Sequence, residues 1–231
     1  MFKLTSLGSG SAFASDLNNT SGYFISNVNS FNLIDCGETV FKKVKPLLKK
    51  NKKLNIFITH MHSDHIGSLP TLIFYCHYVL NTIPNIYFPD KKILMQFLGL
   101  NGVSENFYVI HNDVLTYTKV DDFLVKFIPV KHVETLNSYS LSFEKHYENS
   151  IQTTMFYSGD MSEFPIPPQD IEKYSYIYLE CCLKDYPNNV HMPISKICGA
   201  FNETQWKNIT LMHFDNKELK NIVLLLGFEV L

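Results

Sequence analysis

No run of apolar residues in the 231-residue sequence approaches the roughly 20 that a membrane-spanning helix needs, so we expect no membrane contact. No small-residue cleavage site follows an apolar segment near the N-terminus, and we therefore expect no secretory leader. The chain also lacks internal repeats, low-complexity linkers and the composition shifts that mark domain boundaries. These absences, together with the length, predict one domain that spans residues 1–231.

The cysteines lack the Cys-x-x-Cys spacing of many metal and redox sites, and their number is odd. We expect reduced thiols in a cytoplasmic protein. The adjacent Cys181 and Cys182 are predicted to pack in the core rather than to bind metal.

A net charge of -2 gives no overall indication of nucleic-acid binding. Lysines nevertheless crowd one predicted helix and its exit, at Lys42, Lys43, Lys45, Lys49, Lys50, Lys52 and Lys53. A solvent-exposed helix face is the favoured interpretation of this lysine segment, and an RNA-binding surface is the alternative.

Apolar periodicity predicts the secondary structure. Strands are expected at 2–7, 22–26, 31–35, 54–59, 85–88, 107–111, 123–130, 139–144, 153–158, 176–180, 208–212 and 228–231. Helices are expected near 38–50, 67–80, 91–98, 193–202 and 216–226, and the proline-rich stretch 164–168 is expected to be an irregular loop. Strands and helices in both halves predict two sheets with helices on their outer faces.

The segment His60-Met61-His62-Ser63-Asp64-His65 holds four metal-binding side chains directly after an apolar run at 54–59. The run is predicted to be a buried strand, so the motif lies at a strand end. His60 and His62 are two apart in a segment predicted to be extended, so they can point toward one metal. Asp64 and His65 follow as the chain turns into a helix, so they can face a second position nearby. Two metals about 3.5–4 Å apart are the usual device for hydrolysing phosphate or acyl esters.

Three later strand ends carry the remaining metal-type residues. His132 follows the apolar run 127–130 and is the expected third nitrogen for the first metal, beside His60 and His62. His213 ends the run 208–212 and is expected to complete the second metal with Asp64 and His65. Asp160 closes the strand that ends in Gly-Asp, and its two oxygens can bridge both ions. Nitrogen and oxygen ligands suit two Zn²⁺ ions, and Mn²⁺, Fe²⁺ and Ni²⁺ are also compatible.

Other residues of similar type do not end core strands in this way. His77, His111 and His146 are predicted to be structural or exposed. The abundant aromatic residues offer candidates for stacking on a nucleobase, although most aromatic side chains at such spacing belong to a core. The candidates are Tyr75, Tyr78, Tyr139 and Phe214, and none is assigned to substrate.

The His-x-His-x-Asp-His pattern resembles that of the metallo-β-lactamase superfamily of metal-dependent hydrolases. This resemblance implies an α/β fold of αββα layering, in which two mixed sheets are flanked by helices. Within the superfamily, the tRNase Z-type phosphodiesterases look most similar at their opening motifs, at Gly159-Asp160 and at His213. The opening motifs are residues 7–12 (Leu-Gly-Ser-Gly-Ser-Ala), 19–21 (Asn-Thr-Ser) and 33–38 (Leu-Ile-Asp-Cys-Gly-Glu).

In that branch a Glu and a downstream His outside the metal shell assist the chemistry, and Glu180 and His191 occupy the matching places. The resemblance thus implies that Asp64, His191 and Glu180 are catalytic. Asp64 would accept a proton from the attacking water, and His191, oriented by Glu180, would stabilise the phosphate or protonate the departing oxygen. Two features depart from a tRNase Z: Leu179 stands where a His is usual, and no inserted tRNA-binding arm is present.

The compact form without an arm is similar to the small cyclic-nucleotide phosphodiesterases of this fold. It looks most like the phage anti-Pycsar proteins, which degrade cyclic nucleotide signals made by bacterial defence systems. This implies a 3′,5′-cyclic nucleotide substrate, a nucleoside monophosphate product and a homodimer whose subunits cover each other's active sites. A phage-encoded protein of this kind would act in the cytoplasm of its bacterial host.

Other functions stay open at the level of sequence. The first alternative is a minimal tRNase Z-type endoribonuclease that processes RNA 3′ ends. A thioester or lactam hydrolase of the same fold is a second, because a metal pair does not by itself choose between acyl and phosphoryl substrates. A flavodiiron protein is not expected, because it would carry Glu in place of His62 and would need a flavin domain, and the sequence shows neither. A non-catalytic binding module would be expected to have lost metal ligands.

Overall fold

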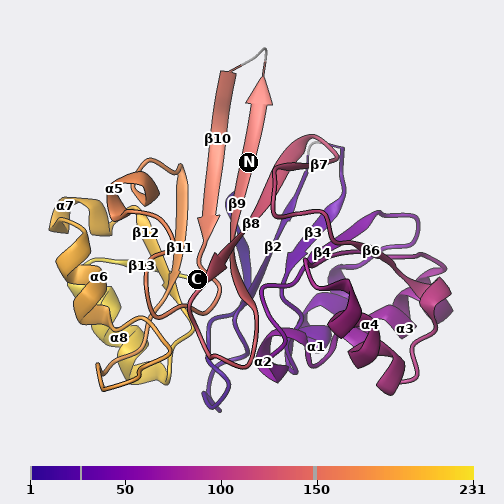
Figure 1. The fold of residues 1–231 in the computed structure, drawn as a ribbon, viewed down its shortest axis with the longest axis horizontal. Coiled ribbons are helices and arrows are strands. Elements are labelled where there is room, and N and C mark those ends of the chain that lie inside the picture. The colour runs from indigo at the N-terminus through magenta and orange to yellow at the C-terminus, as the bar shows by residue number, and fades with distance from the viewer. Residues whose placement is uncertain (1, 27, 148–149) are drawn as a thin grey trace.

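Two β-sheets carry helices on their outer faces in the computed structural model, which describes residues 2–26, 28–147 and 150–231 (Figure 1). The first sheet consists of β1 (Thr5–Gly8), β2 (Ser21–Ile25), β3 (Phe31–Ile34), β4 (Leu54–Phe57), β5 (Asn85–Tyr87) and β6 (Val109–His111), in that spatial order. β1 to β3 pair antiparallel, whereas β3 to β6 pair parallel. Strands β3 and β4 are buried along their whole length because both faces of this sheet are covered.

The second sheet has the order β13-β12-β11-β10-β9-β8-β7. Its strands are β7 (Thr118–Val120), β8 (Phe123–Val130), β9 (Ser138–Tyr147), β10 (Ser150–Tyr157), β11 (Tyr176–Glu180), β12 (Ile209–Met212) and β13 (Glu229–Val230). β7 to β10 pair antiparallel, whereas β10 to β13 pair parallel. Both sheets are therefore mixed, and the predicted fold is confirmed.

Helices fall into two groups, one beside each sheet (Figure 1). The group beside the first sheet is α1 (Val40–Val44), α2 (Ser63–Ile66), α3 (Leu69–Tyr75) and α4 (Lys91–Leu100), with short helices η1 (Lys45–Leu47), η2 (Cys76–Leu80) and η3 (Glu105–Phe107). The group beside the second sheet is α5 (Pro168–Ile171), α6 (Ile194–Ala200), α7 (Glu203–Trp206) and α8 (Lys217–Leu226). No helix in the described part of the chain has the length and apolarity needed to cross a membrane.

Two apolar clusters hold these layers together. The larger one fills the space between the sheets and extends to the helices of the first group; at its centre Phe2, Phe24, Phe123 and Phe143 pack edge-on or tilted. The smaller cluster joins the second sheet to its outer helices, which include α6 and α8. Packing against two sheets explains the unusually high content of aromatic residues.

The elements that were not predicted are all short. They are β7, α2, α5, α7 and η3, of three or four residues each. Tertiary contacts stabilise such pieces, and hydrophobic periodicity cannot detect them. The predicted helix at 67–80 is interrupted: α3 ends at Tyr75, and the chain continues as the π-helix η2, which ends with Asn81 in the left-handed region at φ 52°.

Carboxyl ends of the central strands meet along one edge of the sandwich. β4 leads to His60, β10 to Asp160, β11 ends at Glu180 and β12 leads to His213. Because parallel strands of an α/β sheet present their carboxyl ends on the same side, ligands bind there. The topology thus collects residues that are far apart in the sequence.

Candidate metal centre

A first group of donor atoms comes from three histidines and one aspartate. His60 and His62 leave β4 in extended conformation, and His62 caps α2. His60 Nε2 lies 3.0 Å from His62 Nδ1, and His132 Nε2 lies 3.2 Å from the same Nδ1. Asp160 Oδ2 is 3.8 Å from His60 Nε2 and 3.9 Å from His132 Nε2. These four side chains meet closely enough to hold one metal ion.

A second group lies directly beside the first. Asp64 Oδ2 is 3.2 Å from His213 Nε2 and 3.4 Å from His65 Nε2. Asp160 Oδ1 is 3.2 Å from His65 Nε2, and Asp160 Oδ2 is 3.3 Å from His213 Nε2. Asp160 therefore belongs to both groups, and the structure brings together all seven residues predicted as metal ligands.

Hydrogen bonds outside the two groups determine which ring atoms face inward. The Val190 carbonyl oxygen lies 2.8 Å from His132 Nδ1 and can only accept a hydrogen bond, so Nδ1 carries the proton and Nε2 presents a lone pair. His65 Nε2 and Asp160 Oδ1 are buried and form no hydrogen bond within the described residues. A buried nitrogen and a buried oxygen that lack hydrogen-bond partners and lie among further nitrogen and oxygen ligand atoms fit a pair of divalent cations.

The electrostatics of the centre fit the same interpretation. Burial lowers the pKa of His213, but the carboxylates of Asp160, Asp64 and Glu180 outweigh burial and raise that pKa to about 10. Burial likewise raises the pKa of Asp160, yet its histidine neighbours, His213 first among them, hold it well below the usual range. Burial also lowers the pKa of His65, but neighbouring carboxylates outweigh burial and raise that pKa, so protons on His65 and His213 balance the carboxylates when no metal is bound. A cation can take the place of these protons, because metal binding releases protons.

Asp35 is a residue of this centre that the sequence analysis missed. It is fully buried with φ 58°, and its carboxylate accepts hydrogen bonds from Thr59 N at 2.8 Å and from Thr59 Oγ1 at 2.9 Å. Asp35 Oδ2 also lies 2.9 Å from His65 Nδ1. A signal was present, since Asp35 directly follows the apolar strand β3, in the way that other residues of the centre follow theirs.

Glu180 and His191 lie next to the two groups of donor atoms, near Asp160 and His213. Glu180 is fully buried, and its Oε2 is 2.8 Å from His191 Nδ1 and 3.5 Å from His213 Nδ1. Its Oε1 accepts a hydrogen bond from the backbone N–H of Met161. His191 keeps 26% of its side chain exposed and lies 3.8 Å from Asp160 Oδ2 through Nδ1. Glu180 thus links His191 to a residue of the second group.

The side chain of Asn189 helps to hold the loop before His191. Asn189 Oδ1 accepts a hydrogen bond from the His191 backbone N–H at 3.0 Å, and Asn189 Nδ2 donates to Lys184 O at 3.1 Å. The same loop supplies the Val190 carbonyl that orients His132. One short segment therefore positions both a predicted ligand and a predicted catalytic residue.

An open cavity of about 670 Å³ adjoins His132. Lys131, Tyr186 and Asn188 are among the residues that line it, and Tyr186 is 54% exposed. This volume lies in the range of small-molecule sites.

The remaining histidines and the aromatic candidates lie outside the centre. His77 stacks on Phe107, His111 stacks on Tyr87, and His146 pairs with Glu144. Phe214 and Tyr139 are buried, so their rings are not free to stack on a base; Tyr75 is half-buried, and Tyr78 is 71% exposed on η2. Cys181 packs in the smaller apolar cluster and Cys182 is buried, in agreement with their predicted role as packing residues.

Comparison with known proteins places this centre in a family. The family model described as "Anti-Pycsar protein Apyc1" matches residues 2–224. A relative described as "Anti-Pycsar protein Apyc1", from Bacillus phage 010DV004, is 26% identical over 246 aligned positions that cover 94% of this chain and 90% of the relative.

Solved structures support the fold. The metallo-β-lactamase fold protein YhfI from Bacillus subtilis superposes with a TM-score of 0.75 at 19% identity, covering 99% of this chain and 94% of YhfI. The short form of human tRNase Z superposes with a TM-score of 0.67 at 21% identity, covering 98% and 94% of the two chains. The protein has the metallo-β-lactamase fold and belongs to the anti-Pycsar Apyc1 family.

Proposed function

We propose that this protein is a phosphodiesterase with two metal ions that hydrolyses 3′,5′-cyclic nucleotides to nucleoside monophosphates and so removes a cyclic-nucleotide defence signal. The main observation behind the proposal is that the carboxylate of Asp160 belongs to both groups of donor atoms, which lie beside His191. Family membership supports the substrate class, because the relatives are described as anti-Pycsar proteins.

Each group of donors would hold one ion. His60, His62 and His132 are proposed to hold the first, Asp64, His65 and His213 the second, and Asp160 to bridge them. Nitrogen and oxygen donors without thiolates suit Zn²⁺. A bound metal pair supplies a water of lowered pKa and positive charge that stabilises the phosphate oxygens.

The side chains of the centre would then move protons. Asp64 uses Oδ2 toward His65 and His213, so its second oxygen can accept the proton of the attacking water. The water oxygen bonds to phosphorus while the ring P–O bond breaks. His191 has Nδ1 engaged by Glu180, which leaves Nε2 to protonate the departing oxygen. The nucleoside end of the substrate would occupy the cavity beside His132.

The proposal is tested by incubating the zinc-loaded protein separately with a panel of 3′,5′-cyclic mononucleotides and with a 3′-extended pre-tRNA. We expect opening of cyclic nucleotides and an intact tRNA. Asp64→Asn and His132→Ala should abolish turnover, which excludes a contaminating enzyme. Cleavage of the tRNA alone would instead establish a minimal RNase Z.

We also propose a homodimer, which the resemblance to the small cyclic-nucleotide phosphodiesterases implies. Light scattering on the purified protein tests this: a mass of one subunit across micromolar concentrations would contradict it.

A further inference from the structure

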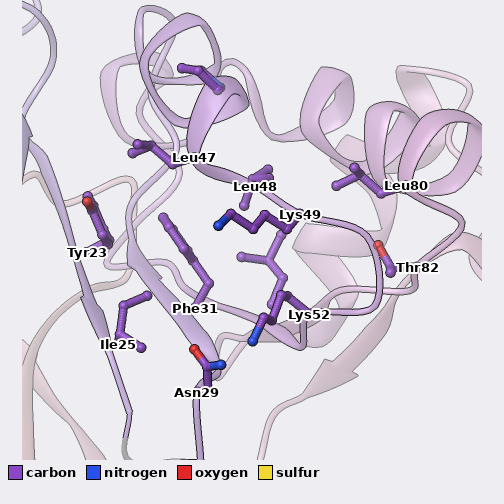
Figure 2. A pocket seen from close by; sticks show the side chains of 12 residues that line it. Tyr23, Ile25, Asn29, Phe31, Leu47, Leu48, Lys49, Lys52, Leu80 and Thr82 are labelled. Carbon is purple, nitrogen blue, oxygen red and sulfur yellow. The ribbon is translucent and has the colours of Figure 1, made fainter.

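A second cavity, of about 440 Å³, lies far from the metal centre along the first sheet. Phe31 and Leu54, the first residues of β3 and β4, line it, whereas Asp35 and His60 follow the opposite ends of the same strands. Figure 2 shows side chains from β2, from the segment around η1 and from the end of η2 around one space. The cavity therefore cannot be part of the site described above.

Its walls are mainly hydrocarbon. Phe31, Leu54 and Leu80 are almost fully buried at its base. Tyr23 stacks on Phe31 with ring centroids 4.5 Å apart and an interplanar angle of 12°. Ile25 at the rim is 44% exposed. This apolar surface, partly open to water, would be covered favourably by a ligand with an apolar body.

The charged residues of the cavity are of one sign. Lys49 and Lys52 line it, and no aspartate or glutamate of the residues that the structure describes does so. Figure 2 shows the Lys49 side chain extending across the space toward Phe31 and the nitrogen of Lys52 on the side of Asn29. Within the described residues neither ammonium group forms an ion pair, whereas the next lysine, Lys53, lies 2.5 Å from Asp121 Oδ1. An anionic group is the complement that the two free ammonium groups would attract.

We propose that this cavity binds a small organic carboxylate, with its hydrocarbon body against Tyr23, Phe31 and Leu80 and its carboxylate between Lys49 and Lys52. A nucleotide fits less well. Ribose hydroxyls and base amides need hydrogen-bond partners, and the walls offer few polar side chains, chiefly Asn29 and Thr82. The volume lies within the range of small-molecule sites.

The test is a titration of the intact, metal-loaded protein with octanoate, followed by ¹H–¹³C methyl NMR. We expect saturable shifts at the methyl groups of Ile25, Leu54 and Leu80. The double variant K49E/K52E should bind at least about tenfold more weakly, because two favourable charge pairs become repulsive. The matched variant K42E/K43E changes the same charge at exposed positions of α1 and should bind as the wild type does.

Two further ligands test whether binding depends on the carboxylate charge and whether a nucleotide can replace the fatty acid. Octanol, which has a similar chain and no charge, should bind at least about tenfold more weakly than octanoate. Uridine 5′-monophosphate should leave the three methyl signals unchanged. The proposal would be overturned if octanoate leaves these signals unmoved at millimolar concentration, if K49E/K52E binds it with unchanged affinity, or if the nucleotide shifts them more strongly.

Discussion

Asp35 Oδ2 lies 2.9 Å from His65 Nδ1, in a buried contact that joins the end of β3 to the first turn of α2. A carboxylate in this position keeps the proton on Nδ1 and turns the lone pair of Nε2 toward the second group of donors. The orientation of a predicted metal ligand therefore depends on a residue that has no contact with the metal position.

Replacing Asp35 with asparagine should weaken metal binding at the second group by about 10- to 100-fold, because the amide no longer holds His65 in one tautomer. Metal content and affinity, measured by competition with a chelator, check this expectation. Asp16→Asn removes an exposed carboxylate and serves as the control. Unchanged affinity in the Asp35 variant would show that His65 is oriented in another way.

His191→Ala should retain both metals and slow the hydrolysis of cyclic nucleotides by roughly 10²- to 10⁴-fold, since only proton transfer to the departing oxygen is lost. His213→Ala should instead lose metal from the second group. Metal analysis of the two variants separates these roles, and His146→Ala, at an exposed histidine, is the control. If His191→Ala also lost its metals, the proposed division between acid and ligand would be wrong.

Gly37→Ala should destabilise the protein by about 1–3 kcal/mol or more, the range for forced overpacking. A Cβ atom at this position would lie 1.8 Å from the Asp64 carbonyl oxygen, so the loop after β3 and helix α2 could no longer approach each other. Gly99 in α4 is the matched control, because nothing lies within 4 Å of its added Cβ. Gly99→Ala should be neutral or stabilising by up to about 1 kcal/mol. Denaturant titrations of both variants measure the two free energies of unfolding.

The ion pair between Asp121 and Lys53 should make stability depend on pH. Burial raises the pKa of Asp121, but hydrogen bonds from Lys53, Ser30 and Asn55 outweigh burial and lower it. A carboxylate whose folded pKa is depressed contributes stability above its unfolded pKa of about 3.9 and loses it as the pH falls through the folded pKa. Lys53 is 48% exposed, so solvent screening limits the contribution to about 1 kcal/mol or less.

Asp121→Asn tests this ion pair without changing the backbone, because asparagine tolerates the positive φ of 52°. The wild type should be the more stable protein in denaturant titrations at pH 7, and its advantage should be smaller at pH 3, where the unfolded carboxyl group is already protonated. A difference that stays constant between these pH values would assign the effect to packing rather than to charge.

The local sequence pattern was sufficient to predict most residues of the candidate metal centre. His60, His62, Asp64 and His65 lie in one short segment that runs from the end of β4 into α2, so their closeness in the sequence already brings them together. Asp160 and His213 follow other apolar strands, and parallel pairing places strand ends on one edge. Apolar periodicity predicted β8 and β12. It did not predict β7, because this strand has only three residues and forms by pairing with β8.

The sequence by itself predicted two sheets with helices on their outer faces, and it predicted which residues after the apolar strands would bind metal, because these follow from the period of apolar residues and the chemistry of side chains. The αββα layering was implied by the resemblance to the metallo-β-lactamase superfamily. Only the tertiary structure decided that Asp35 holds His65, that the Val190 carbonyl orients His132, and that Lys49 and Lys52 line an apolar cavity. Each of these relationships joins segments whose distance in space depends on packing and on backbone conformations such as the positive φ of Asp35. Hydrophobic periodicity carries no information about such contacts.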